Sequence, residues 1–379
     1  MKDESSKDNI GVCHVSTVHY GLDARIFWKE CVSLVSAGYR VTLLAPGIPT
    51  GIVHGVVCIP RRQETRRWLR PLTGLSVFWT VLRLHPRIAH FHDPELVPVA
   101  VVLRIFGLKT IYDAHEDLPK QLKQKKWAQR PVTGFAVKTF ALFLERSLWL
   151  LSAVVYVVQG QTESKMNFHT ALVRNFPRAD IFGPAITPRS PVTLPLNVVY
   201  VGGLTQVRGV HEMINGVGML AEGQARLLLA GRWESGEFRD ACQQSRGWHR
   251  VRLLGDLAHT EIPEVLRGAD IGIFCPSRGP NMDRSIPLKV FEYLASGLPI
   301  VLTDIPFWHE LLGEIPLYVE VPGAASIAAA LAELINDPAS RSERTRQGLA
   351  LLRTNGWYWE NESAELLRLY GEVLGGVRA

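Results

Sequence analysis

The strongest constraint on the fold is a regular alternation of short apolar segments with segments of helical pattern along most of the chain. The first example is an apolar strand over residues 11–16, a helix over 26–37 that Gly38 closes, and a second strand over 40–45. Two strands joined by a crossover helix run parallel. The repeated alternation therefore predicts parallel sheets with helices on both faces, a doubly wound α/β architecture.

A proline-rich interval divides this alternation into two halves. Residues 177–195 contain five prolines and few apolar runs, which is typical of a linker. We expect strands before it at 88–91, 109–112, 153–157 and 171–173, with helices at 95–106 and 132–150, and strands after it at 197–201, 226–230, 251–254, 270–274 and 299–302.

The length of the chain supports two domains, because 379 residues exceed what one core comfortably holds. We predict an N-terminal domain over 1–185 and a C-terminal domain over 186–356, which face a cleft. The last helix, within 357–379, is rich in aromatic residues and leucine, and we expect it to pack back on the first domain. Ligands would bind at the carboxyl ends of strands from both domains.

Cysteine usage and hydropathy indicate the compartment. The five cysteines are far apart and form no C-x-x-C pair, which argues for a reducing cytosol and against a zinc or disulfide framework. The N-terminus is charged and lacks the apolar core of a signal peptide. The longest apolar region, 135–158, is interrupted by charges, so we expect a cytoplasmic protein without a membrane span.

Positive charge gathers in the first half of the chain. Residues 1–185 carry 24 Lys/Arg against 14 Asp/Glu, whereas the remainder carries 18 against 22. Two basic runs, 61–70 and 120–130, each contain one tryptophan. Such runs are solvated surface, docking sites for anionic lipid headgroups, or stacking platforms for nucleic acid. We favour a peripheral position at the inner face of the cell membrane, and expect no nucleic acid.

Residues 276–304 contain a short helix with clear boundaries. Pro287 lies in its first turn, and a Gly-Leu-Pro sequence follows its end. Ser285, Lys289 and Glu292 form a stripe at helical spacing, on the face that we expect to turn away from the core. A lysine in a first helical turn opposes the helix dipole. A bound phosphate would resolve that conflict.

Glycines end several strands of the second half. Gly202 and Gly203 follow a strand and lead to Arg208 and a new helix, and Gly231 and Gly255 follow the next two strands. Glycines let a ligand approach the backbone closely, and Arg208 could reach a phosphate. Each turn alone is weak evidence, but together at one sheet edge they favour a nucleotide pocket. Neither a P-loop nor the G-x-G-x-x-G fingerprint is present.

Two polar loops follow strands of the first half, HFHDPEL over 90–96 and YDAHEDLP over 112–119. Their side chains could bind a metal, hydrogen-bond a sugar or act as acid and base, or be satisfied structural groups. Because no dense metal-ligand spacing such as H-E-x-x-H occurs, we expect no metal.

The motifs LDARIFWKE, HFHDPEL and YDAHEDLP in the first half, and the segments 255–277 and 285–301 in the second, carry a resemblance. The chain resembles a family 4 glycosyltransferase of GT-B fold, the retaining type that uses a nucleotide sugar. The first-half motifs resemble a bacterial branch that builds cell-surface polysaccharides. The resemblance implies a nucleotide-sugar donor, a lipid-linked or growing glycan acceptor, and no metal or other cofactor.

The resemblance also implies roles for individual residues. Catalysis would depend on His115, Arg208 and Lys289. The donor would be bound by Gly202, Gly203, Arg208, Gly231, Leu257, Ser285, Leu288, Lys289 and Glu292. The acceptor side would hold Asp23, Arg25, His92, Glu116 and Asp117. Within these sets, Arg208 and Lys289 would hold the diphosphate, Glu292 the ribose, and the backbone near Leu257 the base.

Two positions depart from the family pattern. Arg284 stands where the first glutamate of the E-x7-E pair is expected, and Leu204 replaces a second arginine after the Gly-Gly turn. Two alternatives to a transferase stay open: a sugar-nucleotide epimerase, which can use a similar two-domain fold, and a catalytically silent partner of another transferase, which Arg284 suggests.

Overall fold

The computed structural model describes residues 10–63, 70–114, 143, 146–157, 169–183, 193–279, 282–283, 285–320 and 323–375. The chain divides into two compact units, one of Met1–Asn175 with Trp359–Ala379 and one of Phe176–Tyr358. The boundary expected at 185/186 lies inside the second unit. The basic run 120–130 and most of the predicted helix 132–150 lie outside the described residues.

The first unit is built on an eight-stranded sheet with the order β3-β4-β2-β1-β5-β6-β7-β8. Its strands are β1 (Gly11–Val15), β2 (Arg40–Pro46), β3 (Gly51–Val53), β4 (Val56–Arg61), β5 (Ile88–Phe91), β6 (Lys109–Ala114), β7 (Ala153–Tyr156) and β8 (His169–Leu172). Neighbours pair in parallel, except for β3 and β4. That hairpin was not predicted. Its turn is His54-Gly55, two residues with positive φ that suit a tight hairpin connection.

Helices cover both faces of this sheet. The π-helical turn η2 (Ile26–Cys31), α1 (Val32–Ser36) and α14 (Trp359–Val373) share one apolar cluster with the strands. Helices α2 (Arg70–Leu84) and α3 (Val97–Ile105) share the other. The short 3-10 turns η4 (Pro94–Leu96) and η6 (Leu148–Leu150) complete the described elements of the unit.

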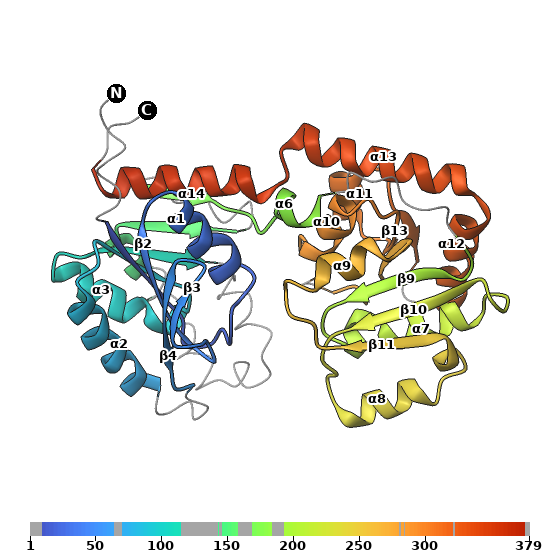
Figure 1. Cartoon of the computed structure of the whole chain (residues 1–379), viewed down its shortest axis with the longest axis horizontal. Coiled ribbons are helices and arrows are strands. Elements are labelled where there is room, and N and C mark those ends of the chain that lie inside the picture. Colours follow the sequence, from blue (N-terminus) through green and yellow to red (C-terminus); the bar gives the residue numbers. More distant parts are fainter. Residues whose placement is uncertain are drawn as a thin grey trace. The chain divides into compact units, whose positions relative to one another are not determined.

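The C-terminal helix α14 packs on the first unit, as the sequence predicted (Figure 1). Trp359 is buried and its indole N–H donates to Ser33 Oγ at 2.8 Å. The carboxylate of Glu362 accepts from the backbone N–H of Arg174 at 2.7 Å and from its guanidinium at 2.8 and 3.0 Å. A tryptophan and a buried carboxylate thus anchor the beginning of the helix.

The second unit contains a six-stranded parallel sheet with the order β11-β10-β9-β12-β13-β14. Its strands are β9 (Leu196–Val201), β10 (Ala225–Ala230), β11 (Val251–Gly255), β12 (Ile271–Phe274), β13 (Ile300–Thr303) and β14 (Leu317–Val319). The sequence predicted the first five of these strands. It missed β14, which has only three residues and gives little periodicity to read.

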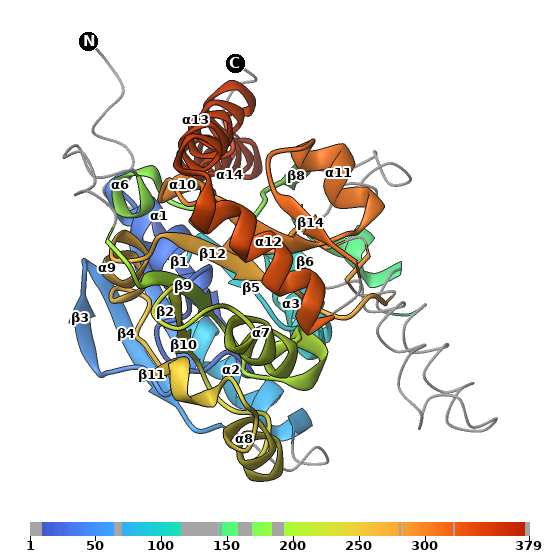
Figure 2. The same cartoon turned by 90° about the vertical axis from the view of Figure 1, so that its right-hand side faces the viewer.

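The helices of this unit are α6 (Ala179–Phe182), α7 (Val210–Gly218), α8 (Gly236–Gln243), α9 (Ile262–Arg267), α10 (Leu288–Ala295), α11 (Pro306–Leu312), α12 (Ala324–Asn336) and α13 (Pro338–Asn355), with 3-10 turns η7 (Gln206–Arg208) and η8 (Trp248–Arg250). Helix α7 joins β9 to β10 and α10 joins β12 to β13, in opposite directions along the sheet. Right-handed crossovers therefore place them on opposite faces. Figure 2 shows α12 beside α7, where Gly216 leaves room for Ile327.

Each sheet reverses its strand order once, between β1 and β5 in the first unit and between β9 and β12 in the second. Crossovers leave these paired strands in opposite directions, which opens a crevice beyond their carboxyl ends. The residues that follow β1, β5, β9 and β12 are therefore the first candidates for a site. None of the described helices is long and apolar enough to cross a bilayer.

Candidate functional site

The turn after β9 brings the backbone against a lysine from α10. Gly202 has a φ of 137°, which favours glycine, and a Cβ there would lie 2.5 Å from Lys289 Nζ. The chain then forms η7, whose N-cap hydroxyl, Thr205 Oγ1, accepts from the N–H of Arg208 at 3.3 Å. Gly209, with a φ of 71°, is the N-cap of α7. The turn thus presents Arg208 and bare backbone at the same edge as Lys289.

Glycines continue along this edge of the sheet. The N–H of Gly202 donates to the carbonyl of Ala230 at 2.9 Å, and the N–H of Gly231 donates to Gly255 at 2.7 Å. Gly231 and Gly255 have φ values of 141° and 78°. Three adjacent strands therefore end in backbone without side chains, as the glycine pattern predicted.

Lys289 is a buried cation held over aromatic rings. Its side chain is 9% exposed, and Nζ donates to Tyr200 Oη at 3.1 Å. Nζ also lies 4.2 Å from the ring centre of Tyr200 and 4.5 Å from that of Phe274. Burial and then repulsion from Arg208 hold the pKa of Lys289 well below its usual range. Among the described residues, no carboxylate forms an ion pair with it, and Glu292 attracts it only at longer range.

Burial also acts on the partner of this lysine. It raises the pKa of Tyr200 to about 12, although the nearby Arg208 guanidinium opposes the shift. The phenol therefore stays protonated at neutral pH and can accept from Lys289 while it donates to the carbonyl of Gly203 at 2.8 Å. An anion at this edge would meet the side chains of Lys289 and Arg208 and a short run of backbone without side chains.

The expectation that the polar stripe of α10 turns away from the core was wrong. Lys289 and Glu292 are both buried, at 9% and 5% exposure, and so is every residue from Lys289 to Ala295. The helix lies in the crossover between two central strands, where neighbouring elements enclose all of its faces. A lysine buried in this way costs free energy unless its charge is compensated, which strengthens the case for an anionic ligand.

The loops after β9 and β12 are tied together. The N–H of Ser277 donates to the carbonyl of Val207 at 2.8 Å, which joins the end of β12 to η7. Further on, Trp308 Nε1 donates to the carbonyl of Ser285 at 2.9 Å and so fixes the entry to α10. Helix α10 begins at Leu288, and Pro287, expected in the first turn, is its N-cap.

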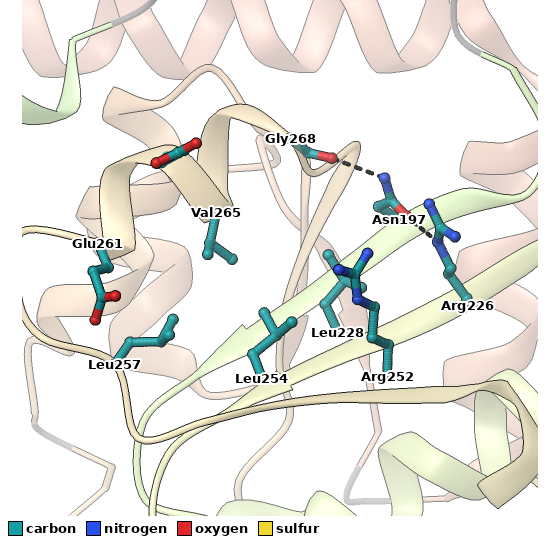
Figure 3. Close-up of a pocket in the computed structure, with 10 residues that line it drawn as sticks. Asn197, Arg226, Leu228, Arg252, Leu254, Leu257, Glu261, Val265 and Gly268 are labelled. Atoms are coloured by element: carbon teal, nitrogen blue, oxygen red, sulfur yellow. Dashed lines mark hydrogen bonds between the residues drawn. The ribbon is translucent and has the colours of Figure 1, made fainter.

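One cavity of the second unit touches the predicted donor residues at a single point. It has a volume of about 410 Å³ and lies between the sheet and α9, where it is lined by Leu228, Leu254, Leu257, Glu261 and Val265 among others (Figure 3). Only Leu257 belongs to the predicted donor set. The cavity therefore adjoins the position expected for a base, but it is also lined by Asn197 and Arg226 near the amino ends of β9 and β10, away from the edge that carries Lys289 and Arg208.

In the first unit, the loops after β1 and β5 meet at Asp93. Its carboxylate accepts from the backbone N–H of Thr17 at 2.5 Å and from the hydroxyls of Ser16 and Thr17 at 3.0 and 3.1 Å. Asp23 caps η2, since its Oδ1 accepts from the N–H groups of Arg25 and Ile26 at 2.8 and 2.9 Å. These carboxylates shape the loops at the carboxyl edge.

Beneath these loops lies a fully buried polar cluster. Arg25 binds Asp113 with two hydrogen bonds, Nε to Oδ2 at 2.8 Å and Nη2 to Oδ1 at 3.1 Å, and its Nε lies 3.0 Å from Glu30 Oε1. His92 Nδ1 lies 3.3 Å from Asp113 Oδ2. Arg25 and His92 are 6% and 1% exposed, so the predicted acceptor-side residues Arg25 and His92 support the loops from inside.

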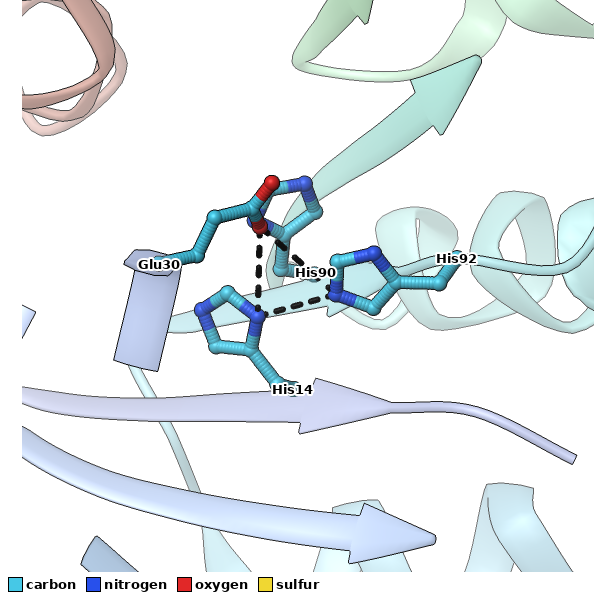
Figure 4. Close-up of side chains that lie close together, drawn as sticks. All are labelled: His14, Glu30, His90 and His92. Carbon is cyan, nitrogen blue, oxygen red and sulfur yellow. Dashed lines mark hydrogen bonds and ion pairs between the residues drawn. The ribbon is translucent and has the colours of Figure 1, made fainter. Parts of the chain in front are cut away.

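Three imidazoles and one carboxylate converge in this cluster (Figure 4). His14 Nδ1 lies 2.9 Å from His92 Nε2, and Glu30 Oε2 lies 3.8 to 3.9 Å from His14 Nδ1, His90 Nδ1 and His92 Nε2. Burial, and then the neighbouring imidazoles, lower the pKa of His14 and His90 well below the usual range. Burial and then repulsion from Asp113 raise the pKa of Glu30.

The structure thus brings part of the predicted site together. Gly202, Gly203, Arg208, Gly231, Ser285, Leu288, Lys289 and Glu292 follow or flank the central strands of the second sheet. Asp23, Arg25 and His92 do the same in the first. His115, Glu116, Asp117 and Arg284 lie outside the described residues. The roles of all these residues stay predictions.

Sequence reasoning missed the residues that surround these positions. Tyr200 and Phe274 look like ordinary strand residues, and only the fold places them against Lys289. For His14 and His90 a weak signal existed. His90 and His92 are two residues apart at the end of a strand and so point to one side of it, and His14 sits in the strand that pairs with them.

Comparison with known proteins identifies the fold first. Sucrose-phosphate synthase from Thermosynechococcus elongatus superposes with a TM-score of 0.74 at 18% identity, over 97% of this chain and 99% of that one. Anabaena HepE, solved in complex with UDP-glucose, gives 0.68 at 12% identity, over 96% of this chain and 100% of that one. The protein has the GT-B fold, as predicted.

Sequence comparison then gives a family match within the second unit. Residues 195–337 match the family model described as glycosyl transferases group 1. A glycogen synthase of Mycobacterium tuberculosis is 27% identical over 195 residues, which cover 50% of this chain and 46% of that protein. The match therefore spans less than half the length of this relative.

Proposed function

We propose that the protein transfers a sugar from a nucleotide-sugar donor to a lipid-linked or growing glycan acceptor, in the synthesis of a cell-surface polysaccharide. We further propose that it acts as a family 4 enzyme with retention of configuration at the transferred sugar. The observation that carries this proposal is Lys289, a buried cation that is aimed at the glycine-rich edge of the second sheet beside Arg208.

The chemistry follows from the charge that develops on the leaving group. When the bond between sugar and diphosphate breaks, negative charge grows on the phosphate oxygens, and fixed cations in a water-poor site stabilise it strongly. Lys289 and Arg208 would supply that charge, with the N–H groups at the start of α10. Because these cations stabilise the negative charge that a divalent metal stabilises in other enzymes, the transfer needs no metal.

The other predicted residues would bind the rest of the donor and the acceptor. Glu292 would bind the ribose and the backbone at Leu257 the base, whose place would lie next to the cavity along α9. His115 would act beside the transferred sugar, and Glu116 and Asp117 on the acceptor side. Arg284, in place of a glutamate, would alter recognition of the donor sugar.

The first experiment identifies the nucleotide-sugar donor. The full chain is screened by thermal shift with UDP-, GDP-, ADP- and dTDP-sugars, and we expect one base to raise the melting temperature selectively, because a ligand that binds only the native state stabilises it by mass action. Incubation of that donor with lipid-linked acceptors should then release nucleoside diphosphate and a glycan of retained configuration. Conversion of the sugar without an acceptor would identify an epimerase, and binding without any transfer would identify a silent partner.

We also propose that an outer face of the first unit, formed by α2 and α3, docks on an anionic bilayer. The two helices pack together with the rings of Phe78 and Phe106 5.7 Å apart. Large apolar side chains nevertheless remain exposed on them, with Trp79 at 53%, Ile105 at 78% and Phe106 at 63%. Exposed arginines, including Arg83, flank them. An apolar patch with basic neighbours suits a negatively charged membrane surface.

Vesicle binding tests this surface. Phe106→Ser should weaken sedimentation with phosphatidylglycerol vesicles by about tenfold or more, because burial of a phenylalanine contributes roughly 1.5–3 kcal/mol. The control is Ile52→Ser, which removes a side chain of 74% exposure from β3. Equal binding of both variants, or equal binding of the unaltered chain to neutral phosphatidylcholine, would rule out the proposal.

A further inference from the structure

We propose that His14, Glu30, His90 and His92 form a binding site for one divalent transition-metal ion, of which zinc fits the ligands best. The four residues come from β1, η2, β5 and the position directly after β5. Each offers one ligand atom, and these atoms all lie within 4.8 Å of one another. The site is separate from the phosphate-binding edge proposed above and takes no part in the transfer reaction.

The distances suit a tetrahedral ion. Metal–ligand bonds of about 2.1 Å place tetrahedral ligand atoms about 3.4 Å apart. In the cluster, His14 Nδ1 and His92 Nε2 are 2.9 Å apart, and Glu30 Oε2 lies 3.8 to 3.9 Å from the imidazoles. The ring centres are 4.6, 4.8 and 5.2 Å apart, so the three imidazoles form one compact cluster. Small side-chain shifts would equalise the separations.

The surroundings of Glu30 also suit an ion. Neither oxygen of Glu30 takes part in a hydrogen bond of good geometry with the described residues, although the residue is fully buried. One oxygen of this carboxylate lies near Arg25, and the other lies among the imidazoles. A cation could therefore bind at the second oxygen. The ion would add positive charge where the single guanidinium of Arg25 faces the two carboxylates of Glu30 and Asp113.

Groups around the four ligands hold them in place. Asp113 contacts His92 Nδ1 at 3.3 Å, which leaves Nε2 to the metal, in the carboxylate–histidine–metal arrangement common in proteins. The Tyr370 hydroxyl lies 3.2 Å from His14 Nε2, which leaves Nδ1 to the metal. It also lies 2.8 Å from His90 Nδ1, and this hydrogen bond would be exchanged for the metal bond. Because Tyr370 belongs to α14, the ion would also support the docking of the C-terminal helix.

The unaltered protein provides the first test. The full chain, purified with a tag that contains no histidine, should retain one zinc ion per chain after dialysis, as measured by elemental mass spectrometry. Removal of zinc with a chelator should lower the melting temperature, and added Zn²⁺ should restore it. Replacement by Co²⁺ should give the intense visible absorption of a tetrahedral cobalt site. Protein that carries no metal, takes up no Co²⁺ and melts at the same temperature with and without chelator would overturn the proposal.

Variants then locate the ion. Glu30→Gln and His90→Gln keep the volume and polarity of the side chains, and each should abolish the cobalt absorption and the response to chelator. The control is His169→Gln, which changes an exposed histidine of β8 and should leave both unchanged. Cobalt absorption that persists in both cluster variants, or that disappears only in His169→Gln, would place any bound metal elsewhere. The wild-type measurements decide the question if a cluster variant fails to fold.

Discussion

Replacement of Lys289 by methionine is expected to reduce glycosyl transfer by about 10²–10³-fold, the typical effect of removing one preorganised group that stabilises transition-state charge. The same change should leave the protein at least as stable. Methionine fills a similar volume against Tyr200 and Phe274, and it removes a buried cation without an ion pair among the described residues. Loss of activity combined with retained or raised stability is the signature of a residue that serves a ligand.

The pH dependence of stability gives a second measurement on the same variant. The pKa of Lys289 is held well below its usual value of 10.5, so in the interval between these values the unfolded chain binds a proton that the native protein does not. Native stability therefore rises with pH across that interval. The advantage of Lys289→Met should be largest on the acid side of the interval and should vanish as the pH approaches 10.5.

The control for this prediction is Lys109→Met, at the start of β6 in the first unit and outside every predicted site. It should leave the rate of transfer unchanged. Undiminished transfer in Lys289→Met would refute the phosphate role. A large loss of stability in Lys289→Met would show instead that the lysine holds the fold together.

Replacement of Asp113 by alanine is expected to destabilise the first unit by about 3–5 kcal/mol, because it leaves the buried guanidinium of Arg25 without its main partner. A loss of this size is a large part of the stability of a typical domain. Since two units need not unfold together, hydrogen exchange is the suitable measurement. Amides of β1, β5 and β6 should exchange faster, whereas those of β9 and β12 should keep their rates.

The matched control is Asp180→Ala, which breaks a bidentate pair with Arg178 at 2.6 and 3.0 Å on the surface, where Asp180 is 57% exposed. We expect no measurable change there, because solvent screens exposed pairs. Adding Arg25→Met to Asp113→Ala should recover part of the loss, since it removes the orphaned charge. If β5 and β6 exchange at the wild-type rate in Asp113→Ala, the pair contributes specificity without stability.

Much of the fold is accessible from local patterns. Residues 11–15 and 40–46 form parallel strands where the β-loop-α-β pattern placed them, and five strands of the second sheet follow the expected order along the chain. Strands β3 and β14 were missed because a three-residue segment has no period to detect, and without β3 the hairpin with β4 could not be predicted. The candidate donor edge was also accessible, because glycines that end successive parallel strands must meet at one edge.

The sequence by itself determined the class of architecture, the glycine-ended strands and the presence of a lysine at the start of a helix, because these depend on residues close together in the chain. Only the tertiary structure decided what that lysine faces and that His14, Glu30, His90 and His92 share one buried point. The physical reason is that burial and electrostatic contact arise between segments brought together by strand order. The prediction that the polar stripe of α10 faces solvent was wrong for this reason, because helical periodicity defines a face of the helix but does not show what packs against it.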